Sequence, residues 1–195
     1  MDTIGCSNEC KLLYSTFNMK SEDYNHLLIK FLSDNDSVIS FTIADNQNII
    51  IDNYPLTKLI YVYKGAVKID TSGSQIDLSK DINQIHLNQG NLIFINAHSR
   101  TKIDISTNDT VLFVFHLKKP FFSVEFMDKL LEYNVFYNFI NYCKMGKNSF
   151  HAHIVYDCNN FIVRQKLFIL MKLISQKEFQ FIKSSLLEIF DYLQN

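Results

Sequence analysis

The stretch KLIYVYKGAVKID, from Lys58 to Asp70, decides the fold of this chain. On both sides of Gly65, aliphatic, β-branched and aromatic residues form short strand-like runs, and after the glycine they alternate with polar residues. Such runs are typical of half-buried β-strands. A glycine between two strands supplies the positive φ that a short turn needs. The sequence therefore predicts a tight hairpin around Lys64 and Gly65.

The same pattern extends in both directions, from about Val38 to Leu117. Short apolar or alternating runs follow one another between turn residues: VISFTIA, QNIIID, TSGSQIDL, NQGNLIFI, TKIDIS and TNDTVLFVF. Many short strands at this spacing are typical of an antiparallel sandwich or a small barrel.

After Pro120 the apolar residues take the period of helices. Ser123 is a suitable N-cap for a first helix, with Glu125 in its first turn. Two further stripes have steps of three and four, Val163, Leu167, Leu170, Ile174 and then Ile182, Leu186, Ile189, Leu193. We therefore predict an α+β protein, with an N-terminal arm and β-barrel at 1–120 and about three packed helices at 121–195.

The composition excludes several classes of protein. With 47% hydrophobic and 14% aromatic residues in 195, the chain can bury a substantial core. Its 19 basic residues are balanced by 20 acidic ones, so no strongly basic face for nucleic-acid phosphates is expected. The sequence contains no run of about 18 uncharged apolar residues, so we expect no membrane-spanning helix. The few, irregularly spaced cysteines and the absence of a signal-peptide pattern predict a cytoplasmic protein with reduced thiols; they are Cys6, Cys10, Cys143 and Cys158.

The known catalytic motifs are absent from the sequence. It contains no Gly-x-Ser-x-Gly, no phosphate-binding glycine loop and no Cys-x-x-Cys. Metal-binding cupin barrels carry a glycine, five residues, a proline and then a histidine, but after Gly90 these two positions hold Asn96 and Thr101. Seven residues before Gly65, where those barrels have a glutamate, stands Lys58. An ammonium repels a cation, so we expect no metal, no cofactor and no catalytic residue.

Two histidine features have alternative interpretations. His98 is either a turn residue with a backbone hydrogen bond or a donor to a polar or anionic ligand at the mouth of a pocket. The two histidines of the HAH triplet, His151 and His153, would share a face in a strand. Without a third ligand, a solvent-exposed position or a helix start is favoured over a metal site.

The segments LIYVYKGAVKI, INQIHLNQGNLIFINAHSRTKI and VLFVFHL, leading into helices, resemble the N-terminal domain of AraC/XylS-family bacterial transcription regulators. FIVRQKLFILMKLISQKEFQFIKSSLLEIF is similar to the closing helix pair in the subgroup of enteric virulence and acid-response regulators. The resemblance covers about Asn46 to the C-terminus. It implies a metal-free cupin-like jelly-roll barrel that binds an effector, and a homodimeric transcriptional activator. It also implies a DNA-binding region of two helix-turn-helix motifs, which would begin where this chain ends, so we expect a fragment or a stand-alone sensor.

The resemblance also suggests the kind of effector. Some related regulators respond to long-chain fatty acids, whose carboxylate would need a lysine or histidine at the rim of an apolar cavity, and others are controlled by a bound protein. The predicted ligand-binding residues are Lys58, Tyr61, Phe94, His98, Phe113 and Phe115.

Two questions stay open at the level of the sequence. The stripe Val163, Leu167, Leu170 and Ile174 is the predicted dimerisation surface, but the same stripe could instead pack on the barrel. Rival functions are a metal-dependent cupin enzyme, such as a dioxygenase or isomerase, and a stand-alone small-molecule binding protein.

Overall fold

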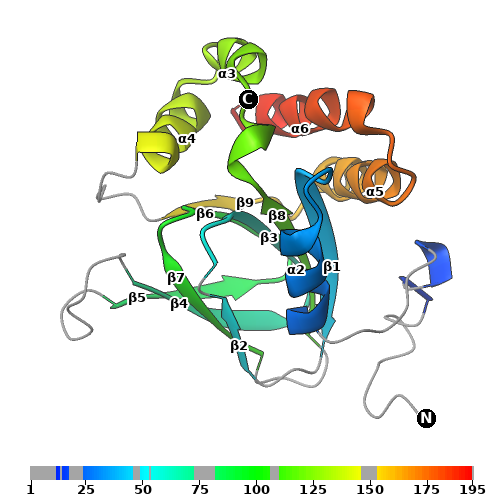
Figure 1. Ribbon diagram of the computed structural model, residues 1–195. Coiled ribbons are helices and arrows are strands. Elements are labelled where there is room, and N and C mark those ends of the chain that lie inside the picture. Colours follow the sequence, from blue (N-terminus) through cyan, green and yellow to red (C-terminus); the bar gives the residue numbers. More distant parts are fainter. Residues whose placement is uncertain are drawn as a thin grey trace.

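A computed structural model describes residues 12–13, 15–17, 24–45, 49–52, 54–72, 82–105, 110–145 and 153–194 (Figure 1). The elements in chain order are α2 (Tyr24–Ser33), β1 (Ile39–Asp45), β2 (Ile49–Asp52), β3 (Thr57–Lys64), β4 (Ala66–Ser72), β5 (Ile82–Asn88), β6 (Asn91–Ile95), β7 (Arg100–Asp104), β8 (Val111–Leu117), a 3-10 turn (Lys119–Phe121), α3 (Val124–Leu130), α4 (Asn134–Met145), β9 (His153–Asp157), α5 (Phe161–Ser175) and α6 (Phe179–Gln194).

The strands pair as one long hairpin that is rolled up. β4 pairs with β5, β3 with β6, β2 with β7 and β1 with β8, each time antiparallel. In the described residues this gives a large sheet in the order β1-β8-β3-β6-β9 and a small sheet in the order β2-β7-β4-β5. Such a rolled hairpin is a jelly roll. The predicted α+β class with a cupin-like jelly-roll barrel is confirmed.

The predicted hairpin around Gly65 is wrong. β3 belongs to the large sheet and β4 to the small sheet, and the two strands do not pair with each other. Gly65 has a φ of 80°, and a Cβ there would lie 2.6 Å from Oγ1 of Thr110. The glycine therefore makes a corner at which the chain passes between sheets.

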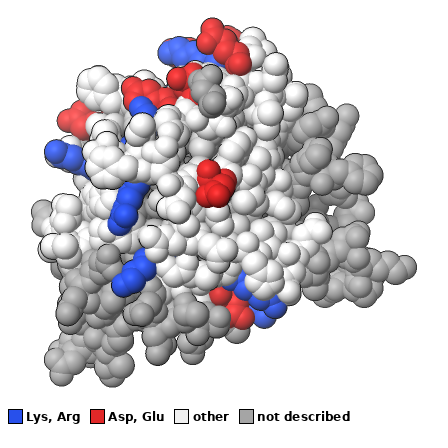
Figure 2. Space-filling view, turned by 180° about the vertical axis from the view of Figure 1, so that it is seen from behind, with Lys and Arg blue, Asp and Glu red and all other residues white. Residues whose placement is uncertain are grey.

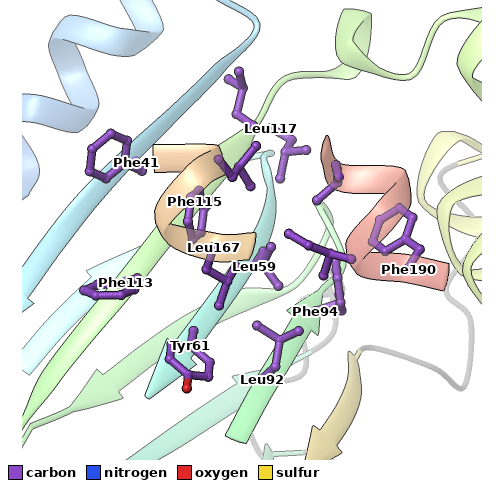
Figure 3. Close-up of a cluster of buried hydrophobic side chains, with 14 of the residues drawn as sticks. Phe41, Leu59, Tyr61, Leu92, Phe94, Phe113, Phe115, Leu117, Leu167 and Phe190 are labelled. Atoms are coloured by element: carbon purple, nitrogen blue, oxygen red, sulfur yellow. The ribbon is translucent and has the colours of Figure 1, made fainter. Parts of the chain in front are cut away.

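The large sheet is buried on both faces, and its alternation separates two cores. Ile60 and Val62 of β3 point into the barrel, where they join residues of the small sheet and Leu28 and Phe31 of α2. Leu59 and Tyr61 of the same strand join the second core, on the outer face of the sheet. Figure 3 shows labelled residues of this outer core extending from the strands toward Leu167 of α5 and Phe190 of α6.

The helical part differs in detail from the predicted three helices. Ser123 caps α3 as expected, with its hydroxyl accepting from the backbone N–H of Phe126 at 3.4 Å. The predicted first helix is divided, however, because α3 ends before the turn at Leu131 and Glu132 and α4 begins at Asn134. α5 and α6 form an antiparallel pair, tied by an ion pair of 2.9 Å between Lys166 and Glu188. None of the described helices is long and apolar enough to cross a membrane.

β9 was not predicted. It lies between α4 and α5 in the sequence and pairs with β6, so a strand from the 121–195 segment completes the large sheet of the barrel. His153 of the HAH triplet begins this strand, while His151 lies outside the described residues.

Candidate functional site

Five polar side chains face one another inside the barrel. Lys58 of β3 lies directly opposite His116 of β8 in the large sheet. In the small sheet Thr101 of β7 lies opposite both Asp52 of β2 and Thr71 of β4. Directly opposite residues of antiparallel strands project on the same face, and all five side chains are at most 1% exposed. We call these residues the polar cluster.

An ion pair forms the centre of the polar cluster. The Nζ of Lys58 lies 3.5 Å from Oδ1 of Asp52, and it donates to the backbone carbonyls of Tyr54 at 3.3 Å and Leu56 at 3.4 Å. The Nε2 of His116 lies 3.2 Å from Oδ2 of Asp52. The carboxylate is thus held between an ammonium and an imidazole, across the interior from one sheet to the other.

The environment sets the charges of the polar cluster. Burial lowers the pKa of Lys58 and of His116, and the negative charge of Asp52 opposes both shifts. Burial alone would raise the pKa of Asp52, but the hydrogen bond with His116 and the charge of Lys58 hold it below its usual value. At neutral pH Asp52 is therefore ionised and His116 neutral, and the ion pair with Asp52 favours the charged form of Lys58.

Two hydroxyls of the polar cluster have no hydrogen-bond partner among the described residues. They are Oγ1 of Thr71 and Oγ1 of Thr101, on neighbouring strands of the small sheet. Leaving a buried hydroxyl unsatisfied costs about 1–3 kcal/mol. Each can both donate to and accept from a bound molecule.

The donor set does not fit a metal ion. First-row divalent metals need several imidazole, thiolate or carboxylate ligands, whereas Asp52 is already paired with an ammonium. Thr101 and Lys58, which occupy two ligand positions of metal-binding cupins, offer a neutral hydroxyl and a positive charge. Within the described residues, no three His, Cys, Asp or Glu side chains are grouped to hold a metal.

Lys58 and His98 lie at the same end of the barrel. Lys58 is opposite Ile95, the last residue of β6, and the turn with His98 follows directly. Lys58 is buried rather than at the rim, while His98 is exposed. The backbone N–H of His98 donates to Oδ1 of Asn96 at 2.9 Å, which agrees with the turn interpretation.

The four predicted aromatic ligand residues lie on the other face of the large sheet. Tyr61, Phe94, Phe113 and Phe115 belong to the outer core, with centroid distances of 5.4 Å from Phe94 to Phe190 and 5.6 Å from Phe113 to Phe168. They do not line the barrel interior with Lys58, because strand alternation puts Lys58 and Tyr61, three positions apart, on opposite faces. Whether they contact a ligand stays a prediction.

The predicted dimerisation stripe packs within the chain. Val163, Leu167 and Leu170 are fully buried in the outer core and Ile174 is half-buried. In this conformation the stripe therefore cannot form a surface for a second copy, and the alternative that it packs on the barrel holds. Dimerisation itself stays a prediction.

Sequence reasoning did not assign Asp52, Thr71 or His116 to the site. Each interrupts an apolar alternation at an interior position, as His116 does after Leu112 and Val114. Such a polar residue can be recognised as part of a site only when the inward-facing positions of each strand are known. Cys158 adds no reactive group, because burial raises the pKa of its thiol to about 12.

No protein-family model matches this chain, and no curated protein matches it. Among solved structures, ToxT from Vibrio cholerae matches at 12% identity with a TM-score of 0.47, over 81% of this chain and 57% of the ToxT chain. The CENP-C cupin domain of Drosophila melanogaster matches at 12% identity and 0.33, over 43% of this chain and 62% of its own. Vicilin from tomato, Solanum lycopersicum, matches at 17% identity and 0.34, over 41% of this chain and 22% of its own. The chain thus spans little more than half the length of ToxT.

Proposed function

We propose that this chain is the ligand-sensing and dimerisation domain of an AraC-type transcriptional regulator in the cytoplasm, without catalytic activity. A small effector binds in the barrel and controls a DNA-binding region elsewhere in the regulator. The resemblance of the strand and helix motifs to that family supports this proposal, as does a jelly roll followed by helices.

The polar cluster is the observation that carries the proposal. Replacing a buried ion pair by apolar residues is often neutral or stabilising, so stability alone does not account for such a pair. Here Lys58 and Asp52 lie in an interior otherwise lined by residues such as Ile60 and Val114, beside two hydroxyls without partners. Perturbed titratable groups of this kind gather at functional sites.

The proposed effector is an apolar anion such as a fatty acid. Its carboxylate would accept from Nζ of Lys58 and from the hydroxyls of Thr71 and Thr101, and its chain would contact the aliphatic interior. Asp52 would repel this carboxylate unless a proton is taken up nearby. Because His116 already contacts Asp52, it is the group that would take up that proton, so binding should be tighter at pH 6 than at pH 8.

The large sheet offers a route from the effector to the helices. Lys58 is followed by Leu59, and His116 lies between Phe115 and Leu117, and all three of these apolar neighbours belong to the outer core that contains α5 and α6. A ligand that moves β3 or β8 would therefore change the packing of the helices. A population shift requires only that the effector binds more tightly to one of the two helix arrangements, the packing seen here or the changed packing.

This part of the regulator is not proposed to bind DNA itself. On the face shown in Figure 2, the drawn Lys and Arg side chains are scattered and accompanied by Asp and Glu, without a continuous basic area. The overall charge is also close to balanced.

Thermal unfolding with a panel of fatty acids and the alcohols of the same chain lengths tests this function. A binding acid at 100 times its dissociation constant should stabilise the wild type by about 2.7 kcal/mol, and the matched alcohol should stabilise it less. Lys58→Met should abolish the difference between acid and alcohol. Lys102→Met, on an exposed position of β7, is the matched control and should keep it.

No stabilisation by any acid, or equal stabilisation of the wild type and Lys58→Met, would refute the proposed effector chemistry. A stoichiometric metal in the purified protein would favour the cupin enzyme instead.

A further inference from the structure

The outer edge of β9 is the feature that no function discussed so far uses. β9 ends the large sheet, and β6 is its one hydrogen-bonded strand neighbour in the part of the chain that the structure describes. The N–H of Cys158, just after β9, donates to the carbonyl of Gly90 at 2.9 Å. Since the backbone groups of a strand alternate in direction, those of Tyr156 and Ile154 also point toward β6. The N–H and C=O of Val155 then point outward, to the edge.

Among the residues that the structure describes, this edge lacks the devices that usually prevent strands from pairing. Proteins protect sheet edges with lysine, proline, bulges or a covering element. β9 has the sequence HIVYD, with no lysine or proline, and its register with β6 is regular. At the other end of the large sheet α2 packs against β1, as Figure 1 shows. Unlike β9, β5, which is one of the two edge strands of the small sheet, presents mainly exposed Asn, Gln and His side chains.

The residues of β9 are complementary to a second copy of the same strand. In an antiparallel pair centred on Val155, His153 of each copy lies opposite Asp157 of the other, and Ile154 lies opposite Tyr156. An imidazole N–H can donate to a carboxylate, and aromatic and β-branched residues are favourable cross-strand partners. Val155 is 41% exposed and meets its own counterpart at the two-fold axis.

We infer that two copies of this chain associate through antiparallel pairing of their β9 strands, which joins the two large sheets into one continuous sheet. Ile154 and Tyr156 keep their packing on the helix side, where Tyr156 stacks on Phe136 of α4 at 5.4 Å. The association therefore keeps the packing of these two side chains within each copy. A contact of one short strand buries little area, so the dimer should be weak and dependent on concentration.

Sedimentation velocity of the whole chain from micromolar to millimolar concentration tests this interface. The wild type, with a monomer mass of 22.8 kDa, should shift to the mass of a dimer as the concentration rises. Val155→Pro should remain a monomer throughout, because proline removes the central one of the backbone donors that point outward and an edge strand tolerates it there. Val155→Thr keeps this donor and a β-branched side chain, so it should dimerise like the wild type.

A second variant keeps the test decisive if Val155→Pro does not fold. Val155→Lys places two like charges opposite each other at the axis and should also give a monomer, whereas Val124→Lys on α3 should leave the dimer intact. A wild type that stays monomeric at millimolar concentration overturns the inference, as does a dimer of Val155→Lys. In the latter case, loss of the dimer in Ile169→Lys would assign the interface to the exposed face of α5. The inference does not depend on effector binding, so a negative ligand panel leaves it standing.

Discussion

Lys58 is fully buried inside the barrel, where its ammonium pairs with the carboxylate of Asp52. Its spacing from Gly65 marked it as a substitute for a metal-binding glutamate, and the structure places it with Thr101, the substitute for a histidine, in one polar cluster. The third charged or titratable member of this cluster, His116, could not be predicted. His116 and Asp52 are 64 residues apart in the sequence, and only the register of the rolled hairpin brings them together.

The polar cluster should make the protein less stable in acid. The pKa of His116 is lower in the folded state than its ordinary value of 6.5. Between the folded-state pKa and 6.5 the unfolded chain binds more protons than the folded chain, so stability falls as the pH drops below about 6.5. The pKa of Asp52 is below 3.8, so its contribution is present above that pH and is lost as the pH falls toward the folded value. Urea unfolding at a series of pH values from 7.5 to 4 measures this slope.

His116→Gln identifies the group responsible. Glutamine can still donate to Asp52 but does not titrate, so the loss of stability between about pH 6.5 and 5 should become smaller than in the wild type. His98→Gln, in the exposed turn, is the control and should keep the wild-type slope. An unchanged slope in His116→Gln would mean that another group causes the acid sensitivity.

At the scale of elements, periodicity predicted which residues are apolar together but not what covers them. The stripe of α5 was recognised from its steps of three and four, yet this pattern is the same for a dimer interface and for packing on a sheet. The hairpin at Gly65 failed for a related reason, because strands that are neighbours in the sequence need not pair. β9 was missed because its short run HIVYD interrupts a segment in which the apolar residues on both sides have helical spacing.

Truncation of α5 separates its buried face from its exposed face. Leu167→Ala removes a fully buried side chain between the helix and the large sheet and should lower the free energy of unfolding by about 2–5 kcal/mol. Ile169→Ala on the same helix removes a side chain that is 54% exposed and should change it by less than about 0.5 kcal/mol. Denaturant midpoints with unchanged slopes measure both. Equal effects would contradict the observed orientation of α5.

At the scale of the whole molecule, the barrel and the helices share one sheet. Phe94, Phe113 and Phe115 of the barrel strands are at most 2% exposed because helices cover them, while their neighbours Ile93, Leu112 and Val114 fill the interior. The division at residue 120 therefore runs through a common core, and β9 crosses it as well.

This shared core predicts a single cooperative unfolding transition. Losing the helices would expose the whole aromatic face of the large sheet, whose burial is the dominant favourable term in folding. Far-UV circular dichroism, which reports helices and strands, and tyrosine fluorescence, which includes Tyr63 against Phe168 of α5, should therefore give coincident urea transitions for the whole chain. The fragment 1–120, which also lacks β9, should fail to give the dispersed NMR spectrum of a folded barrel. Two separated transitions, or a folded fragment, would show that the interior core alone stabilises the jelly roll and that the helices do not contribute to its stability.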